Sequence, residues 1–263
     1  MTTPHNTSQI RIQPITNAED FQRCFEITAS AFGTQTADGI WKAFHPGWDT
    51  PEGRVLGASR MQSRWAASSL TSTGSPNVVY LKATVLDPSG PGAGLVGKEG
   101  EVIAGMAIWV QASMVPGNGD LPPTDLVKAL ELDTLYPGDE SAQKFLCQVV
   151  RSLTKSRLEA VKEAETRDPP AILALDLCAV DPAFQRRGIA AELVKWGLEE
   201  AQRRGGLEAV TEASKKGRGV YAKLGFEQQG EIEYLLDDEF RDRMMPSNVF
   251  MRTGTSPKTV LHK

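Results

Sequence analysis

The chain has 263 residues, 40% of them hydrophobic, and a formal net charge of −4. This length allows one large hydrophobic core, and we expect a single domain with insertions rather than two independent domains. The acidic balance argues against sequence-independent binding of nucleic acid, which needs a basic surface.

Cysteine spacing and hydropathy argue against a disulfide-bonded, zinc-binding, secreted or membrane-spanning protein. Cys24, Cys147 and Cys178 are far apart and form neither a disulfide nor a zinc pattern. The first residues lack a basic segment followed by an apolar one, and no stretch approaches the roughly 20 apolar residues of a membrane span. We therefore expect a cytoplasmic protein without metal or membrane contact. Its single domain would span residues 9–252, between loose termini at 1–8 and 253–263.

The first 70 residues predict one strand and two helices. Residues 10–15 alternate apolar and polar side chains, as a half-buried strand does. Asn17 is a suitable N-cap for a helix whose Phe21 and Phe25 share one face. An aromatic loop at residues 41–48 precedes a helix at residues 54–70. We interpret the aromatic side chains of this loop as anchors on the core, with a place beside a binding site as the alternative.

Residues 78–85 and 101–110 are predicted strands of an antiparallel hairpin. The segment between them, Gly92-Ala-Gly94-Leu-Val-Gly97-Lys98, imitates phosphate-binding loops. Such loops require a helix directly after the glycines, whereas β-rich sequence follows here. Glu99 also stands where a magnesium-binding hydroxyl would be needed. We therefore predict no phosphate site in this loop.

Residues 113–170 are predicted to form a helical insertion. Residues 116–138 are rich in Pro, Gly and Asp around a short helical segment. Residues 139–167 predict one long helix with Phe145, Val149 and Leu153 along its apolar face. Asp168-Pro-Pro would end it, because a residue before proline is disfavoured in the α region. We expect this insertion to pack beside the substrate cleft.

The most informative segment lies in a core at residues 171–230. An apolar strand at residues 171–180 leads through a turn into Gln185-Arg186-Arg187-Gly188, and a helix follows. Free N–H groups at a helix N-terminus bind phosphate oxygens, and a glycine lets the backbone approach a bulky anion. Arginines in a first helical turn oppose the helix dipole unless an anion lies beside them. The turn therefore predicts a diphosphate site.

The run from Gln185 to Ala190 resembles the pyrophosphate-binding signature of the Gcn5-related N-acetyltransferase (GNAT) superfamily, Gln/Arg-x-x-Gly-x-Gly/Ala. A second match follows a predicted strand at residues 207–214: the helix at residues 215–224 ends in Tyr221-x-x-Leu-Gly-Phe226. Ser214 stands where many members have Asn, and Glu212-Ala-Ser-x-x-Gly217 resembles fungal members. The resemblance implies an α/β (α+β) acyl-CoA N-acyltransferase fold: a mixed, mostly antiparallel sheet flanked by helices and closed by strands at residues 227–236 and 248–252.

The resemblance also implies acetyl-CoA as co-substrate. The backbone of residues 177–180 would pair with pantetheine, and the turn would hold the diphosphate. The implied binding residues are Leu177, Cys178, Ala179, Val180, Gln185, Arg186, Arg187, Gly188, Ile189, Ala190 and Ser214.

Two residues are the candidates for catalysis. The resemblance implies that Tyr221 donates a proton to the leaving thiolate; ordinary core packing is the alternative. Asp176 is the first candidate for the general base, since an acid in an apolar strand is costly unless it is paired or used. A purely structural pair with a residue such as Arg187 is its alternative, and Glu212 is the reserve base. Cys178 has no adjacent His, which argues against a nucleophile.

These observations predict an N-acetyltransferase, monomeric or homodimeric, that passes the acetyl group directly to an amine in a ternary complex. A small-molecule acceptor is favoured, and the acidic residues 237–239 suggest a cationic or aromatic amine. Two alternatives remain: a CoA-binding module without turnover, and a transferase acting on protein lysines or N-termini.

Overall fold

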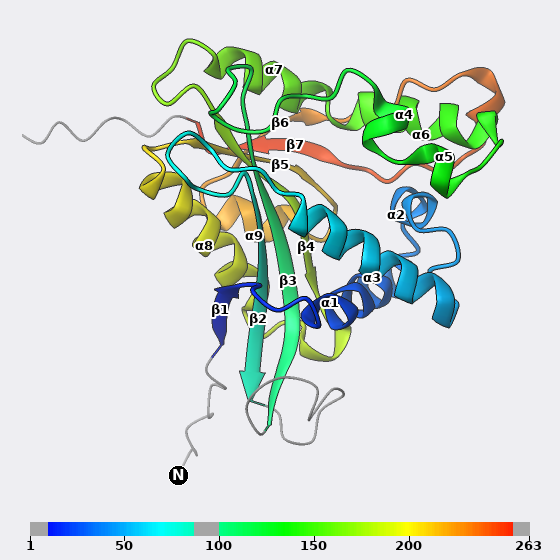
Figure 1. Ribbon diagram of the computed structural model, residues 1–263, viewed down its shortest axis with the longest axis horizontal. Helices are drawn as coiled ribbons and strands as arrows, with labels where there is room; N and C mark the ends of the chain where they lie inside the picture. The colour runs from blue at the N-terminus through cyan, green and yellow to red at the C-terminus, as the bar shows by residue number, and fades with distance from the viewer. Residues whose placement is uncertain (1–9, 87–99, 255–263) are drawn as a thin grey trace, which may run out of the picture.

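The computed structural model describes residues 10–86 and 100–254 (Figure 1). Within these residues the centre is a seven-stranded sheet in the order β1-β2-β3-β4-β5-β7-β6. Neighbouring strands are antiparallel except β4 and β5, which are parallel. The predicted fold class is therefore confirmed. The strands are β1 (Arg11–Pro14), β2 (Val78–Leu86), β3 (Glu101–Ala112), β4 (Ile172–Val180), β5 (Glu208–Ala213), β6 (Glu227–Glu231) and β7 (Val249–Arg252).

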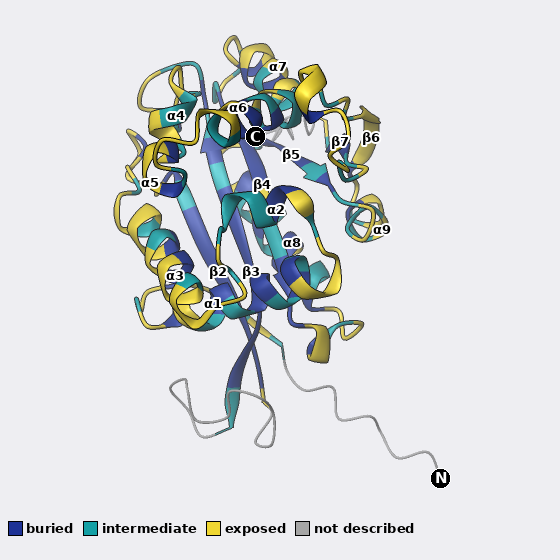
Figure 2. Ribbon diagram, turned by 90° about the vertical axis from the view of Figure 1, so that its right-hand side faces the viewer, coloured by how far each residue is buried: buried dark blue, intermediate teal, exposed yellow. Residues whose placement is uncertain are grey.

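Helices cover both faces of the sheet. Alternate side chains of β3 point to opposite faces and pack into the two core clusters that lie there. Ala107 and Trp109 belong to the core cluster with α8 (Ile189–Arg203). Met106 and Ile108 belong to the cluster with α1 (Asp20–Thr28) and α3 (Pro51–Ala66). A π-helix, Ala29–Gln35, continues α1. The sheet is thus buried between the helices, whose outer faces are exposed (Figure 2).

The helices of the insertion gather over one end of the sheet, at the top of Figure 1. They are α4 (Leu126–Ala129), α5 (Leu132–Leu135), α6 (Glu140–Leu153) and α7 (Lys155–Ala164). A core cluster joins α5 and α6 to α2 (Gly39–Phe44) through Ile40, Leu132 and Phe145. The remaining helix, α9 (Arg218–Lys223), follows β5.

Two helix starts differ from prediction. Asn17 does not cap α1: its side-chain oxygen accepts a hydrogen bond from the Glu19 N–H at 3.1 Å, and the helix begins at Asp20. The helix predicted from residue 54 begins at Pro51, because the Thr50 hydroxyl caps it by accepting from the Gly53 N–H at 3.0 Å. Proline suits a first helical turn, whose N–H groups have no partner in the helix.

The predicted long helix at residues 139–167 is wrong, although Asp139 caps its start as the pattern suggests. The chain breaks at Thr154 into α6 and α7. The hydroxyls of Ser152 and Thr154 donate to backbone carbonyls four residues earlier, at 2.9 and 2.8 Å. Such bonds compete with the helical ladder and bend or end helices. The break turns α7 toward β4 and β5.

The strand predicted at residues 227–236 is shorter than expected, since β6 ends at Glu231. The residues after β6 leave the sheet and bind to α6 instead. The Leu235 N–H donates to the Ser152 hydroxyl, and the Asp237 N–H donates to the Gln148 side chain, both at 3.0 Å. The predicted glycine-rich loop at residues 92–99 and loose residues 1–8 lie outside the described residues, as do residues 255–263.

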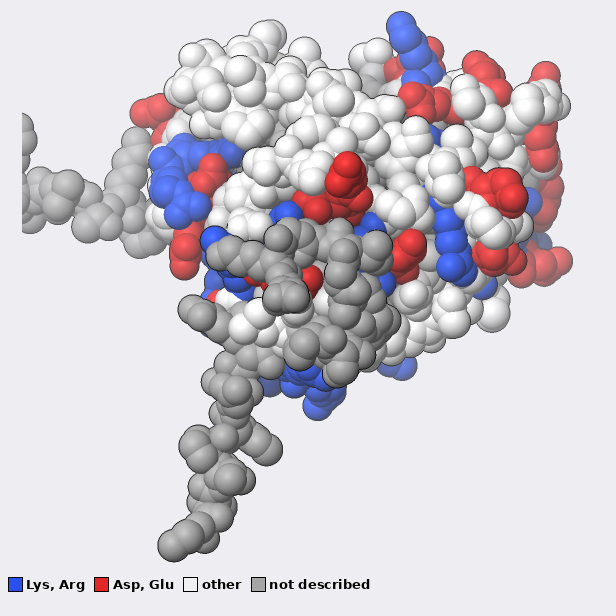
Figure 3. Space-filling view, turned by 60° about the horizontal axis from the view of Figure 1, so that its bottom comes forward, with Lys and Arg blue, Asp and Glu red and all other residues white. Residues whose placement is uncertain are grey.

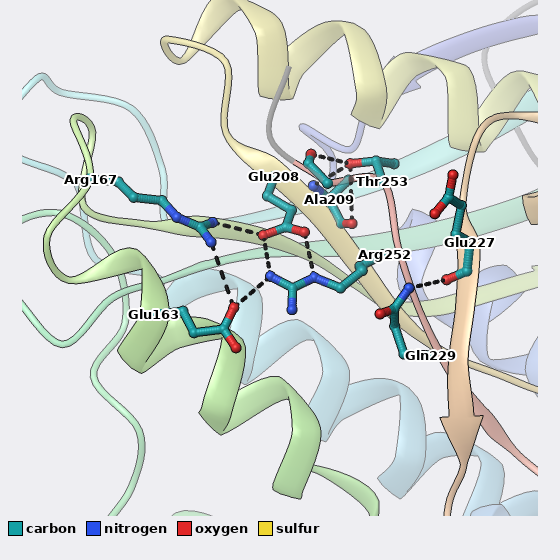
Figure 4. A network of polar contacts seen from close by, with 9 residues as sticks. Glu163, Arg167, Glu208, Ala209, Glu227, Gln229, Arg252 and Thr253 are labelled. Atoms are coloured by element: carbon teal, nitrogen blue, oxygen red, sulfur yellow. Dashed lines mark hydrogen bonds and ion pairs between the residues drawn. The ribbon is translucent and has the colours of Figure 1, made fainter. Parts of the chain in front are cut away.

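A buried carboxylate anchors the start of β5. The side chain of Glu208 is fully buried and accepts from Arg252 Nε at 2.5 Å and from Arg167 Nη1 at 2.7 Å (Figure 4). Glu163 of α7 bonds Arg252 from the exposed side, at 2.8 Å. Burial would raise the pKa of the Glu208 carboxyl, but the hydrogen bonds from Arg252 and Arg167 outweigh it, so the pKa is lowered.

Glu208→Gln is expected to destabilise the fold by about 3 kcal/mol, because it removes the charge that both arginines share. A carboxylate whose pKa is lowered on folding stabilises at neutral pH, and this contribution is lost as the pH falls through the folded pKa. The difference from wild type should therefore shrink in acid. Denaturant titrations at pH 7 and pH 3 measure this; a constant difference would contradict it.

Candidate active site

The turn after β4 is held in place by Asp181. Its carboxylate accepts from the Ala183 N–H at 2.9 Å and from Arg23 Nη2 of α1 at 2.5 Å. Gln185 then ties the turn back to the strand, donating to the Val180 carbonyl at 3.0 Å. The backbone leading into α8 is thus fixed at both ends.

The predicted diphosphate site has the backbone that such a site requires. Arg186 and Gly188 have φ of +67° and +88°, the left-handed region, and all of Arg186, Arg187 and Gly188 are exposed. Among the described residues no side chain caps α8 at Gly188. A Cβ built at Gly188 meets no atom within 4 Å, so the space in front of the helix is open. The first amides of α8 are therefore available to an anion.

Arg187 lies beside this site rather than against Asp176. Its guanidinium donates to the Ala183 carbonyl at 3.3 Å and stacks over Phe184, 5.0 Å from the ring centroid. A structural pair for Asp176 was the alternative to a base, with Arg187 as an example of the partner; the structure pairs Asp176 with Arg157 and Arg64 instead. Basic and acidic side chains are interspersed over the face seen in Figure 3.

β4 parts from β5 halfway along. Their pairing runs from Ile172 opposite Glu208 to Leu175 opposite Thr211, and stops there among the described residues. Residues 177–180 still pair with β3 on their other side. The edge of β4 that faces β5 is thus open between the cavity described next and the turn at Gly188.

A cavity of about 900 Å³ opens where the strands part. Asp176, Leu177 and Cys178 of β4 line it from one side, with Glu212, Ser214 and Tyr221. The insertion lines it too, as expected, through residues such as Val150 and Leu158. Another part of the wall is aromatic and comes from Phe32, Trp41, Phe44 and His45.

The aromatic segment serves both suggested roles. The predicted loop at residues 41–48 contains a short helix, α2, which Asp38 caps by accepting from the Trp41 N–H at 2.9 Å. Trp41 packs in the core against Phe25 and Trp48, yet it also lines the cavity. Core anchoring is therefore confirmed, and Trp41 and Phe44 line the cavity as well.

Tyr221 reaches the cavity from α9. Its ring is 8% exposed and packs against Phe226 at 5.9 Å. Burial raises the pKa of its phenol well above the usual value, so the hydroxyl stays protonated and can donate a proton. Burial likewise raises the pKa of the Cys178 thiol to about 12, which disfavours a thiolate nucleophile.

Gly217→Ala is expected to lower kcat by about tenfold without weakening acetyl-CoA binding, because a 1 Å misplacement of a catalytic group can cost more than this. A Cβ at Gly217 would lie 2.6 Å from Tyr221 Cε2 and 3.0 Å from its hydroxyl oxygen, so the ring must move. Gly219→Ala is the matched control, since a Cβ there meets nothing within 4 Å. Equal kcat values for the two variants would contradict the prediction.

Asp176 and Glu212 share one cation, Arg157 of α7. Arg157 Nη1 donates to Asp176 Oδ1 at 2.9 Å, and Nε donates to Glu212 Oε1 at 3.0 Å. Arg64 Nη2 lies 3.8 Å from Asp176 Oδ2. Burial would raise the pKa of the Asp176 carboxyl, but the charges of Arg157 and Arg64 outweigh it, and the pKa is lowered. Asp176 is thus ionised and paired.

Two residues that line the cavity, Arg157 and His45, were given no place in the site on the basis of the sequence. Arg157 is one of many charges on a polar helix, and only the break at Thr154 brings it to the cavity. His45 stacks on Trp41, with ring centroids 4.5 Å apart, and its Nδ1 is buried without a partner among the described residues. Burial, with the charges of Arg60 and Arg64, lowers its pKa to about 3, so the ring is neutral.

Within the described residues no helix is both long and apolar enough to cross a membrane, and no three His, Cys, Asp or Glu side chains are grouped to hold a metal.

Comparisons with known proteins bear on this geometry. Residues 155–226, which hold β4, the turn, α8 and Tyr221, match the model of the acetyltransferase (GNAT) family. No curated protein matches the sequence.

Solved structures share the whole fold at low sequence identity. Arylalkylamine N-acetyltransferase 2 of Aedes aegypti aligns at a TM-score of 0.55 and 21% identity, over 93% of this chain and 98% of that one. The Drosophila melanogaster polyamine N-acetyltransferase aligns at 0.53 and 12%, over 93% and 98%. An acetyltransferase of Corynebacterium glutamicum aligns at 0.51 and 16%, over 95% and 99%.

The two sequence motifs, the matched family model and the shared fold agree with one another. Residues 155–226 are similar to the acetyltransferase (GNAT) family, and the chain shares the fold of the solved acetyltransferases named above.

Proposed function

We propose that the protein transfers an acetyl group from acetyl-CoA directly to a small amine with an apolar body. One observation carries this: the open edge of β4 at residues 177–180 joins the uncapped turn at Gly188 to the cavity that holds Tyr221. A long molecule with a diphosphate in its middle and a reactive end fits such a path. Acetyl-CoA supplies an activated acetyl thioester there.

The residues that would bind acetyl-CoA divide into two groups. Amides and side chains from Gln185 to Ala190 would hold the diphosphate, with the charges of Arg186 and Arg187 beside it. The backbone of residues 177–180, including Cys178 and Ala179, would pair with pantetheine as an added strand. Ser214 lines the cavity at the end of β5 and can hydrogen-bond near the thioester.

Tyr221 acts as the general acid in this proposal. It donates its proton to the leaving sulfur while the bond between amine nitrogen and acetyl carbon forms and the carbon–sulfur bond breaks. The products are the N-acetylated amine and free CoA thiol, and Tyr221 recovers its proton from solvent. No acetylated enzyme residue forms, which matches the protonated state of Cys178.

Asp176 remains the candidate that takes the amine's proton. An alkyl amine with a pKa of about 10.4 is only about 0.04% neutral at pH 7, so proton removal is a real part of the barrier. Because the pKa of Asp176 is lowered, this carboxylate holds the proton briefly and passes it to water. Glu212 shares the same arginine and is the second candidate.

The walls of the cavity favour an apolar monoamine. Five carboxylates line it, and each has a partner within the described chain. Asp38 accepts a hydrogen bond from the Trp41 N–H, and Asp120 accepts one from the Asn77 side chain. Glu131 forms an ion pair with Arg60, and Asp176 and Glu212 both form ion pairs with Arg157. Among the described residues the same cavity is lined by five cationic side chains, Arg60, Arg64, Arg151, Lys155 and Arg157, so its carboxylates give no excess negative charge to attract a second ammonium group. An aryl or alkyl group would instead bury area against Trp41 and Phe44.

The acidic residues 237–239 do not support the suggested attraction of a cationic amine. Asp237 and Glu239 both bind Lys144 Nζ, at 2.6 and 2.8 Å, and Asp238 pairs with Arg241. None of the three lines the cavity. Their charge is offset by the chain's own cations.

Calorimetry with acetyl-CoA and a thiol-release assay on an amine panel test the proposal together. We expect 1:1 binding, turnover that is faster on arylalkyl or alkyl monoamines than on diamines of equal length, and intersecting double-reciprocal plots. Binding without turnover on any amine, peptide lysines included, would instead indicate a CoA-binding module. Turnover confined to peptide lysines or N-termini would indicate a protein acetyltransferase.

A further inference from the structure

The point where β4 and β5 separate is bridged by a residue from the insertion. Asp176 and Glu212 are the first residues after the last paired positions, Leu175 and Thr211. Arg157 contacts both: Nη1 donates to Asp176 at 2.9 Å, while Nε, at 3.0 Å, and Nη2 donate to the two oxygens of Glu212. One guanidinium therefore connects the two strands where hydrogen bonding between them ends.

We propose that Arg157 is a positioning residue, which sets the gap between the parted strands and holds the carboxylates of Asp176 and Glu212 at its edge. The inference rests on the proposed function, because the gap matters only if the thioester lies in it. The planar guanidinium suits this role, since its donors form a rigid fork and two of them grip Glu212. A flexible ammonium offers no such fixed spacing.

Burial strengthens the case that this contact is specific. The side chains of Arg157 and Glu212 are only 16% and 5% exposed, whereas the ion pair of Arg241 and Asp238 at the surface is 74% and 89% exposed. Buried charges are costly unless they are well paired, so Arg157 and Glu212 need one another, and Asp176, with a side chain 29% exposed, pairs with the same guanidinium.

The charged and titratable groups around Asp176 and Glu212 determine how the pKa values of these two carboxyls would respond to the removal of Arg157. Asp176 also faces Arg64 of α3 and the Tyr80 hydroxyl of β2, and Glu212 also faces Tyr234 from the segment after β6. Without Arg157, the more exposed Arg64 would remain as the cation beside two carboxylates. Two like charges at one site raise the pKa of one of them. Protonation of that carboxylate at a higher pH than in the wild type would then appear as a new acidic limb.

The insertion thereby gains a second role besides lining the cavity. Arg157 reaches β4 and β5 because the helix breaks at Thr154 and α7 turns toward the sheet. A movement of α7 would therefore be passed directly to the gap between the strands.

The test compares Arg157→Gln, Arg157→Lys and the control Lys162→Gln, which removes a positive charge from the exposed face of the same helix. Wild-type turnover is measured first, since its absence on every amine refutes the proposed function and not this inference alone. For Arg157→Gln we expect kcat to fall by about 100-fold, a loss typical of misplaced reacting groups, with acetyl-CoA affinity changed by less than about fivefold. Its kcat/KM should gain an acidic limb that wild type and Lys162→Gln lack.

Arg157→Lys keeps the charge without the fork and is expected to fold even if Arg157→Gln does not. It should lack the acidic limb but recover only part of kcat. A wild-type kcat in Arg157→Lys would show that fixed spacing is not needed and would overturn the inference. So would a folded Arg157→Gln with the wild-type rate and pH profile.

Discussion

Gly188→Val is expected to weaken acetyl-CoA binding by about 100-fold or more while the protein stays folded. Gly188 has φ of +88°, and its missing side chain leaves open space in front of the first amides of α8. A branched side chain there would occupy the space that a diphosphate needs and would push the backbone out of the left-handed region. Both effects remove charge-assisted hydrogen bonds, which are the strong ones in such a site.

Gly74→Val is the matched control for that variant. Gly74 has φ of +84° and likewise no atom within 4 Å of a built Cβ, but it lies between α3 and β2, in a different part of the fold from the turn. The two variants should lose similar stability through backbone strain, and only Gly188→Val should lose affinity in calorimetric titration. Equal acetyl-CoA affinities for the two would refute a diphosphate site at the turn.

Tyr221→Phe is expected to lower kcat by about 100-fold and leave acetyl-CoA affinity unchanged. The substitution removes the proton donor from the leaving sulfur, and general acids commonly contribute at least this factor. Since burial raises the pKa of Tyr221 well above its usual value of 10, the wild-type hydroxyl remains a donor throughout the neutral and mildly alkaline range. The wild-type rate should therefore show no loss through Tyr221 ionisation below about pH 10.

Tyr136→Phe controls for the loss of a tyrosine hydroxyl elsewhere. The Tyr136 hydroxyl donates to the Ala43 carbonyl at 2.7 Å and does not line the cavity. This variant should lose about 1 kcal/mol of stability and keep its turnover. If steady-state rates of Tyr221→Phe matched the wild type, Tyr221 would be a packing residue, as its contact with Phe226 alone would suggest.

Local sequence signals were enough to predict the central part of the segment that matches the acetyltransferase family model. The strand at residues 171–180 and the helix from Ile189 follow from hydrophobic periodicity, and Gly188 marks the turn between them. The structure confirms β4 and α8 at those positions, with Gly188 in the left-handed region. These features depend on residues close in sequence, which is why a single sequence reveals them.

The environment of Asp176 could not be predicted in the same way. Arg187 was named as an example of a structural partner, but the actual partner, Arg157, comes from the insertion. That contact depends on the break at Thr154, where two side-chain hydroxyls outweigh an otherwise continuous helical pattern. His45 and Trp41 entered the cavity wall for a similar reason, since their position follows from packing against α1 and α3.

A crystal structure with CoA and a non-reactive amine analogue is the most direct measurement of the central idea. We expect the diphosphate on the amides of Gly188, Ile189 and Ala190, pantetheine along residues 177–180, and the sulfur beside Tyr221 with the amine in the cavity. A CoA molecule whose diphosphate lies away from Gly188, or whose sulfur points out of the cavity, would contradict it.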